Sequence, residues 1–301
     1  MGTAGQVVYV DSGSTDDSVA MSRARGSVVV ELDLSVPFTA ARARNAGFEA
    51  LLSMNPSLDY VFFVDGDCEV MPGWLEAAHH FLDERPEVAV VSGRRRERYP
   101  EKSFYNKLCA MEWEDYPFGE TTACGGDALM RVAAFRGVNG FRPDLICGEE
   151  PELCIRLLHA GWQIWRLQLD MTLHDAAMYR FGQWWRRTVR AGYAFAQGAA
   201  LHGASPQRLW VKESRRAWLW GLLLPAITLL VCGLIGSAGV LLVLIYPLQV
   251  LRVTLRGRRS FRENLLQATA QIFGRFPEAV GLLKFMLDRW RQLQPQLIEY
   301  K

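Results

Sequence analysis

Two aspartates separated by one glycine, Asp65 and Asp67, follow directly on the apolar run Tyr60–Val64. Carboxylate oxygens are the ligands of hard divalent cations, and one or two carboxylates suffice when substrate phosphates supply the remaining ligands. Gly66 leaves the space between the two carboxylates open for a ligand. A solvated turn would carry the same residues, so the pair alone leaves both interpretations open. Its position at the end of a buried run favours the cation site.

Three glutamates, Glu149, Glu150 and Glu152, open a stretch whose apolar positions predict a helix. The helix dipole stabilises acidic residues in a first turn by about 0.3–1 kcal/mol, which would explain all three without a catalytic role. A carboxylate that points into a cleft can instead act as a general base. The pattern by itself does not separate the two explanations.

A glycine pair, Gly125 and Gly126, is followed by Asp127. Such a pair lets the backbone approach a ligand closely, or it forms a plain loop. His174 comes after the apolar stretch Ile164–Leu173 and could place an imidazole beside the carboxylates. A single histidine is more often structural, so His174 alone carries no functional prediction.

Short apolar runs that alternate with helix-forming stretches must position these side chains. Strands are predicted at 7–10, 27–32, 60–64 and 88–91, and helices at 40–54 and 74–84. This alternation predicts an α/β fold with a doubly wound sheet, in which ligands bind beyond the carboxyl ends of the strands. The basic cluster Arg94–Arg98 is expected in a solvated or diphosphate-facing loop after the last of these strands.

Charge is divided unequally along the 301 residues. Residues 211–301 hold 13 Lys/Arg and 5 Asp/Glu, and the first 210 residues hold the remaining 21 and 27. The overall charge of +2 therefore combines an acidic part with a basic tail. Because the part with the candidate site is net acidic, nucleic acid is not a predicted partner.

An uncharged segment of 35 residues, Ala217–Leu251, lies at the start of the basic tail. It is nearly twice the ~20 residues that a membrane-spanning helix needs, and its weak middle, Cys232–Gly239, predicts a turn. A transmembrane hairpin or a re-entrant pair of helices is expected, with a buried helical hairpin as the alternative. Basic residues on both sides place both ends in the cytoplasm.

Two more segments predict amphipathic helices. Phe181–Arg190 is rich in Trp and Arg, which is typical of a helix at a membrane interface and also of an ordinary surface helix. The segment 264–290 predicts two helices that are separated near Pro277. The six cysteines show no CxxC spacing or paired framework, which argues against a zinc ribbon or a disulfide scaffold and fits a reducing compartment.

The motifs, taken in order, resemble the family 2 glycosyltransferases, which have the GT-A fold. The matching segments are DSGSTD at 11–16, ARxRNxG at 41–47, DGD at 65–67, GGD at 125–127, EEPEL at 149–153 and His174. The resemblance covers about residues 5–200. It implies a mixed α/β sheet of GT-A type, followed by a helical membrane region.

The resemblance also implies roles in binding the donor. Asp11 matches the aspartate that contacts the nucleotide base, and Arg44 and Asn45 match a segment near the donor diphosphate. Asp65 matches the aspartate that usually lies near the ribose. Family members normally begin with a strand that helps to hold the nucleotide, whereas this chain begins at what would be the second strand. Either the start of this sequence lies too far downstream or the protein lacks part of its donor site. The first is expected, because losing a central strand and its helix would expose apolar surface.

Metal, base and acceptor roles follow in the same way. Asp67 matches the aspartate that binds Mg²⁺ or Mn²⁺, and His174 is expected to complete the metal site. Glu150 falls at the position of the catalytic base, and the adjacent Glu149 leaves the choice between them open. The residues expected to contact the acceptor are Gly126, Asp127, Trp184, Trp185 and Arg186.

Together these roles imply an inverting glycosyltransferase of hexosyltransferase type, which moves a sugar from a nucleotide-sugar donor to a lipid-linked or polysaccharide acceptor in cell-surface or exopolysaccharide synthesis. The alternatives are a polyprenyl-phosphate glycosyltransferase and a non-catalytic assembly subunit with an incomplete donor site. The expected location is the cell inner membrane, with the catalytic domain facing the cytoplasm. The expected segments are a catalytic domain at 1–200, an interfacial linker at 201–216, the transmembrane part at 217–251 and basic amphipathic helices at 252–301.

Overall fold

The computed structural model describes residues 5–293 and 295–299, and the chain divides into two compact units. The first unit is formed mainly by residues 5–98 and 113–175, and the second mainly by residues 99–112 and 176–293. By compactness, the residues just after 175 thus group with the C-terminal helices. The functional boundary at residue 200 stays a prediction.

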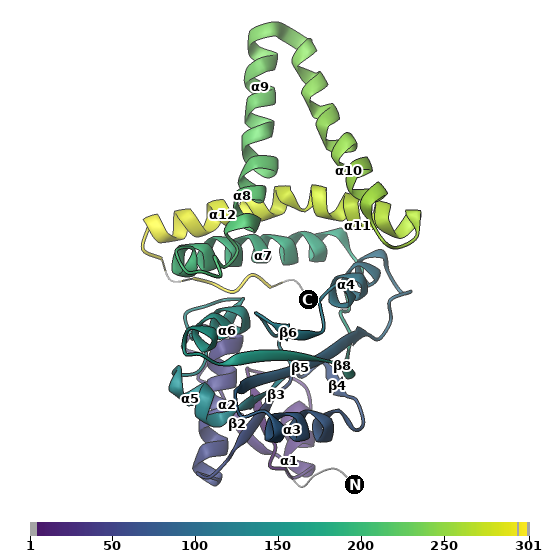
Figure 1. The fold of residues 1–301 in the computed structure, drawn as a ribbon. Coiled ribbons are helices and arrows are strands. Elements are labelled where there is room, and N and C mark those ends of the chain that lie inside the picture. Colours follow the sequence, from purple (N-terminus) through teal and green to yellow (C-terminus); the bar gives the residue numbers. More distant parts are fainter. Residues whose placement is uncertain (1–4, 294, 300–301) are drawn as a thin grey trace. The chain divides into compact units, whose positions relative to one another are not determined.

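A six-stranded mixed sheet is the centre of the first unit (Figure 1). β5 and β8 are parallel, while the other neighbours in this sheet pair antiparallel. The strands run in the order β3 (Tyr60–Phe63), β7 (Ala128–Arg131), β5 (Val88–Glu97), β8 (Gln163–His174) and β4 (Cys68–Val70), with β6 (Gly119–Thr121) also paired to β8. This is the mixed α/β architecture that the alternating pattern predicts.

Both faces of this sheet are covered by helices because successive side chains of a strand point to opposite sides. In β7, Ala128 and Met130 enter one apolar cluster, and Leu129 enters the other with Trp74 of α3 (Trp74–Glu84). The first cluster is completed by α2 (Ala40–Met54), α5 (Val132–Gly137) and α6 (Glu149–His159). The predicted bounds of α2 and α3 are confirmed.

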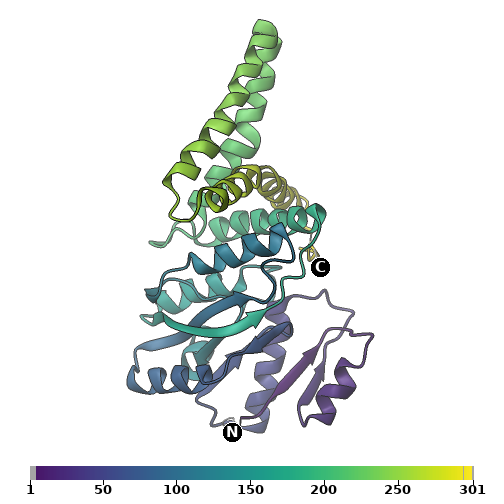
Figure 2. The ribbon, with the colours of Figure 1, turned by 90° about the vertical axis from the view of Figure 1, so that its right-hand side faces the viewer.

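A second, two-stranded sheet lies beside the first and is drawn in purple in Figure 2. β1 (Val8–Asp11) and β2 (Val28–Glu31) are parallel and are joined through α1 (Ser18–Ala24). Among the described residues, neither strand pairs with the six-stranded sheet. α2 contacts both sheets, because Gly47 packs against Val10 while Phe48 enters the core cluster around β3 and β7.

β5 continues through the basic cluster, so the prediction of a loop there is wrong. The strand pairs with β8 from Val88 to Glu97, and Arg94 and Arg96 both pair with Asp170 of β8. Paired backbone and cross-strand ion pairs thus make a strand of residues whose charges suggested a solvated loop.

The second unit is helical. Its elements are α4 (Phe104–Glu114), α7 (Phe181–His202), α8 (Val211–Trp218), a π-helical segment (Leu219–Leu223), α9 (Leu224–Ile235), a 3₁₀ segment (Gly236–Leu244), α10 (Ile245–Arg256), α11 (Phe261–Phe273) and α12 (Arg275–Trp290). α11 begins with a capping box in which Ser260 and Glu263 bond each other's backbone N–H groups. The last helix break lies at Gly274, not near Pro277, because proline is tolerated in the first turn of a helix.

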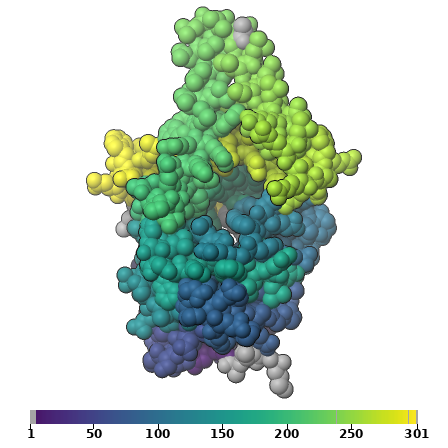
Figure 3. Space-filling model, viewed as in Figure 1, coloured from purple at the N-terminus to yellow at the C-terminus, as the bar shows by residue number. Residues whose placement is uncertain are grey.

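Two helices, Val211–Ile235 and Gly239–Arg256, are long and apolar enough to cross a membrane. Only 6% and 11% of their most apolar 18-residue windows are buried, so they are not core helices of the described chain. The two helices form a hairpin, drawn in green in Figure 3. On the face shown there, no other helix of the unit covers the tip of this hairpin. The first helix has 25 residues, because it already begins at Val211, in the basic segment that precedes Ala217.

Two glycines let α7 and α12 pack backbone to backbone. A Cβ on Gly192 would overlap the carbonyl oxygen of Glu278, and a Cβ on Gly281 would overlap that of Val189. Gly192→Ala is therefore expected to lower the free energy of unfolding by about 1–3 kcal/mol, measured as a lower thermal midpoint in detergent. Gly233→Ala in α9, which meets no described atom within 4 Å, is the matched control. Equal midpoints for the two variants would refute this packing.

Glu278 predicts a pH dependence for the second unit. Burial raises the pKa of this carboxyl to about 7, against the opposing effect of Arg275. Since the folded-state pKa exceeds the ordinary 4.5, the folded state binds its proton more tightly, and stability is lost as pH rises from about 4.5 to 7. The thermal midpoint should fall between pH 5 and pH 8, and Glu278→Gln should flatten that fall. An equally steep profile in the variant would show that other groups cause it.

Candidate functional site

Acidic and basic side chains meet where several strands of the six-stranded sheet begin or end on the same side. Asp65 and Asp67 follow β3, Asp127 immediately precedes the antiparallel β7, and His174 ends β8. Residues that are up to 109 positions apart are thus brought together by strand pairing. The predicted clustering of the DGD, GGD and His174 motifs is present in the structure.

Arg44 of α2 connects the aspartates to the glutamates of α6. Its guanidinium donates to Asp65 Oδ1 at 2.6 Å, to Glu149 Oε1 at 2.7 Å and to Glu150 Oε1 at 2.9 Å. Burial alone would lower the pKa of Arg44, but the carboxylates of Glu150, Asp65 and Glu149 outweigh burial and raise it. Arg44 is therefore a permanent positive charge between two groups of carboxylates.

Asp127 fixes the turn that carries the two aspartates. Its carboxylate is fully buried and accepts from the backbone N–H of Asp65 at 3.0 Å, from Thr172 Oγ1 at 2.6 Å and from Arg95 Nε at 3.1 Å. Arg95 also donates to Asp65 Oδ2 at 3.1 Å. Asp127 thereby holds both the backbone of the turn and the arginine that faces it. A contact between Asp127 and an acceptor stays a prediction.

We expect Asp127→Asn to lower the free energy of unfolding by about 2 kcal/mol, because the half-buried Arg95 loses one of the two carboxylates that it faces and the buried side chain loses its charge. Thermal unfolding of the purified chain checks this. Asp170→Asn serves as control, since Asp170 pairs with Arg94 and Arg96 at a more exposed position. A midpoint unchanged in Asp127→Asn would contradict the assigned role.

Gly126 has no room for a side chain. A Cβ there would lie 2.7 Å from Asp65 Oδ2, 3.0 Å from Arg44 Nη2 and 3.1 Å from Arg95 Nη2. The glycine pair thus permits a close approach, although in this structure the groups approached are charged side chains of the chain itself. Just before it, Cys124 Sγ lies 3.5 Å from Cys154 Sγ of α6.

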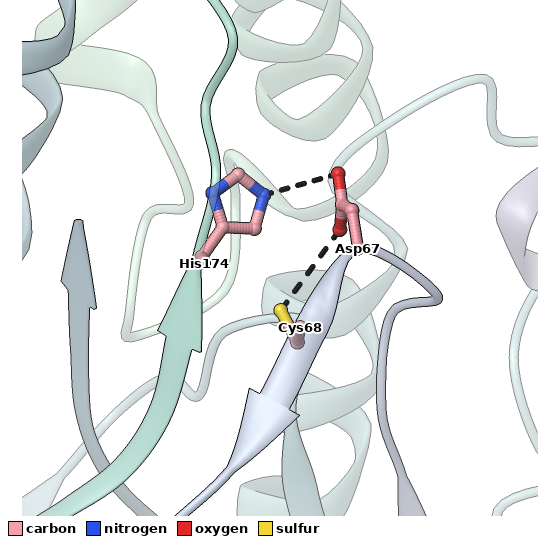
Figure 4. A group of neighbouring side chains, drawn as sticks. All are labelled: Asp67, Cys68 and His174. Atoms are coloured by element: carbon pink, nitrogen blue, oxygen red, sulfur yellow. Dashed lines mark hydrogen bonds and ion pairs between the residues drawn. The ribbon is translucent and has the colours of Figure 1, made fainter. Parts of the chain in front are cut away.

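The exposed Asp67 and the buried His174 lie side by side at one end of the cluster (Figure 4). Asp67 Oδ2 lies 3.3 Å from His174 Nε2, and 41% of the Asp67 side chain is exposed. His174 Nδ1 lies 4.0 Å from Oε2 of the buried Glu97, and Trp113 packs edge-on against the imidazole. Burial lowers the pKa of His174, but the neighbouring carboxylates of Asp67 and Glu97 raise it above its ordinary value.

The donor atoms here suit a divalent cation. Asp67 offers a carboxylate oxygen and His174 an imidazole nitrogen within one group that also includes Cys68. Burial, and then the carboxylate of Asp127, strongly raise the pKa of the Cys68 thiol, which therefore stays protonated. An oxygen and nitrogen set without thiolate fits Mn²⁺ or Mg²⁺ better than zinc.

The three glutamates of α6 have different surroundings. Glu152 is buried and forms a 2.8 Å ion pair with Arg156, which also bonds the Gly140 carbonyl, so Glu152 is structural. Glu149 and Glu150 instead face Arg44, and their side chains are 6% and 15% exposed. The more accessible of the two is Glu150, the predicted base.

Asp11 and Asn45 are engaged with backbone groups. The Asp11 carboxylate accepts from the N–H groups of Gly13 at 2.9 Å and Ser14 at 3.1 Å, and the hydrogen bond with Ser14 is the main cause of its lowered pKa. Asn45 donates to the Phe141 carbonyl at 2.7 Å and accepts from the Phe141 N–H at 3.0 Å. Both side chains therefore shape loops, and their donor contacts stay predictions.

Three predicted acceptor residues belong to the second unit. Trp184, Trp185 and Arg186 belong to α7 in the second unit, where Trp184 stacks with Tyr105. Their contact with an acceptor stays a prediction.

Two residues at the strand-end cluster were not predicted. Arg95 and Glu97 of β5 point toward Asp127 and His174, while Arg94 and Arg96 point toward Asp170. The signal was present in the sequence, because such alternation is the period of a strand.

Comparison with known proteins agrees with this arrangement. Residues 4–139 match the family model described as Glycosyl transferase family 2. Two curated relatives, both named pre-mycofactocin glycosyltransferase, from Mycobacterium tuberculosis strains CDC 1551 / Oshkosh and ATCC 25618 / H37Rv, are 31% identical over 146 residues. The match covers 45% of this chain and 30% of each relative.

A solved structure shows a similar fold. The mannosyltransferase PcManGT from Pyrobaculum calidifontis, in complex with GDP-Man and Mn²⁺, superposes with a TM-score of 0.59 at 19% identity. The superposition covers 94% of this chain and 78% of that one. Residues 4–139 are therefore similar to glycosyl transferase family 2, and the fold of the chain is GT-A-like.

Proposed function

We propose that the protein is an inverting glycosyltransferase that moves a sugar from a nucleotide-sugar donor to a lipid-linked or polysaccharide acceptor at a membrane. The observation that carries the proposal is the strand-end cluster, in which Asp67 and His174 lie beside the network joining Asp65, Arg44 and Glu150. The match of residues 4–139 to glycosyl transferase family 2, and a fold similar to that of a mannosyltransferase solved with GDP-Man and Mn²⁺, support it.

In this proposal the residues of the cluster divide the work. Arg44 and Arg95 supply fixed positive charge toward the departing diphosphate. Glu150 takes the proton of the acceptor hydroxyl, and a single displacement at the anomeric carbon inverts its configuration. Asp65 and Asp127 hold the two arginines in place, with contacts of 2.6 Å and 2.8 Å.

Asp67 and His174 would hold the divalent cation. When bound, Mn²⁺ or Mg²⁺ supplies a Lewis acid that neutralises diphosphate charge. The Asp67 carboxylate is 41% exposed and lies 3.3 Å from His174 Nε2, so one cation could contact both donor atoms.

The helical unit supports a membrane location. The basic residues on both flanks of the two apolar helices fit an inner-membrane hairpin with its ends in the cytoplasm. A membrane-bound enzyme of this topology would take its nucleotide-sugar donor from the cytoplasm.

The test is release of nucleoside diphosphate by the purified chain in detergent, measured over a panel of nucleotide sugars with Mn²⁺, with Mg²⁺ and with EDTA. We expect release from at least one donor, dependent on the cation. Absence of both release and calorimetric binding of every donor would refute the proposal and favour a non-catalytic assembly subunit.

A further inference from the structure

A cavity of about 720 Å³ lies among α9, α10, α11 and the first turn of α12, entirely within the second unit. This volume is within the range of small-molecule sites in proteins. Tyr246, Phe273 and Phe276 form an aromatic wall, with the rings of Tyr246 and Phe276 stacked at 5.5 Å. The cavity is thus walled in part by rings that hold one another in place.

The polar groups of the wall are mostly turned away from the cavity. The Tyr246 hydroxyl donates to the Trp220 carbonyl at 2.6 Å, and the Thr228 hydroxyl donates to the Leu224 carbonyl at 2.9 Å. Apart from Thr269, the other lining side chains are hydrocarbon or aromatic. A polar ligand would lose its hydrogen bonds with water in this cavity without gaining others. The cavity therefore favours a hydrocarbon ligand.

The cavity wall belongs to the two candidate membrane helices. Both helices are mostly unburied within the described chain, and the cavity includes residues from each of them. In a bilayer, the surroundings of such a wall are lipid chains. A lipid tail can therefore enter without crossing water.

An arginine-rich corner lies where α10 ends and α11 begins. Arg252 directly follows the lining residue Leu251, and Arg262 lies one turn before the lining residue Leu265. In this corner, four arginines are exposed and have no ion pair among the described residues: Arg252, Arg256, Arg258 and Arg262. Guanidinium groups bind phosphate in a bidentate manner, so the corner complements a phosphate headgroup.

We propose that this cavity binds the hydrocarbon tail of a polyprenyl-linked acceptor, whose phosphate groups lie against the arginine corner. The inference rests on the proposed function, because it identifies the acceptor as lipid-linked. A single cavity suits the single chain of a polyprenyl lipid better than the two chains of a phospholipid. The acceptor hydroxyl belongs to the sugar carried by this lipid.

The test is photolabelling of the full chain in detergent with farnesyl diphosphate that carries a diazirine in its tail, followed by mapping of the labelled peptides. We expect label on α9, α10 and α11. Val250→Trp fills the cavity and should reduce labelling at least about tenfold. Leu248→Trp, on the same helix at an exposed position outside the cavity lining, is the matched control and should label like the wild type.

A second variant avoids the cavity and its packing. Arg256→Gln combined with Arg258→Gln removes exposed charges that have no described ion pair, and it should weaken labelling about tenfold. Label outside the three helices, or label unchanged in both variants, would overturn the inference.

Competition identifies the headgroup and the tail. Unlabelled farnesyl diphosphate should compete, and inorganic diphosphate should not. Equal competition by phosphatidylglycerol would show that the cavity takes ordinary membrane lipid, which also overturns the inference. Donor-dependent nucleoside diphosphate release is measured on the same preparation. Release without specific labelling refutes the tail site alone. Specific labelling without either release or calorimetric donor binding leaves the tail site standing and refutes the glycosyltransferase function.

Discussion

Asp67→Asn is expected to lower donor-dependent release of nucleoside diphosphate by about a thousandfold. The change removes one negative charge from the exposed end of the cluster, where Asp67 lies 3.3 Å from His174. A divalent cation needs an ionised carboxylate there, and neutral asparagine binds it far less well. Loss of electrostatic stabilisation of a leaving group typically costs about 10²–10³ in rate.

Binding of Mn²⁺, followed by electron paramagnetic resonance, gives a second measurement for Asp67→Asn. We expect weaker binding together with the slower release, while the thermal midpoint changes little because the side chain is 41% exposed. Asp144→Asn is the matched control, since Asp144 pairs with Arg142 on the surface. Full activity of Asp67→Asn at low Mn²⁺ would remove Asp67 from the metal site.

Local sequence patterns were sufficient for the elements that carry the site. α2 and α3 have the predicted bounds because their residues favour helix, and because α3 also places Trp74, Ala78 and Leu82 on one buried face. The two aspartates follow β3 as predicted, since a buried strand ends where its apolar residues give way to the turn-forming sequence Asp-Gly-Asp. These features depend on residues that are neighbours in the chain.

The missing features depend on residues that are distant in the chain. Arg95 belongs to the site only because β5 pairs with β7 on one side and with β8 on the other, which aligns it with Asp127. The Arg94–Arg98 segment has the composition of a loop, and the pairing partner that makes it a strand lies more than 70 residues later. No local propensity contains that information.

The surroundings of α6 separate three glutamates that the sequence left equivalent. Glu152 forms an ion pair with Arg156, which lies one helical turn later on the same face of α6. Glu149 and Glu150 both reach Arg44, which is over 100 positions earlier, and only the fold reveals this. The choice between these two is open to a direct experiment.

Glu150→Gln is expected to lower the turnover number with a good acceptor by about 10²–10⁴, the usual contribution of a general base. Glutamine keeps the size of the side chain and can still accept from Arg44, which lies 2.9 Å away in the wild type. It cannot take up the proton of an acceptor hydroxyl. Donor binding, measured by calorimetry, should therefore change much less than turnover.

Glu149→Gln is the matched comparison, because Glu149 lies in the same helical turn and bonds the same arginine at 2.7 Å. Its side chain is the more buried of the two, so its substitution should act mainly on stability and less on turnover. If Glu149→Gln abolishes turnover while Glu150→Gln does not, the base has been assigned to the wrong glutamate. If neither variant slows transfer, the acceptor nucleophile needs no base, as expected for a phosphate rather than a sugar hydroxyl.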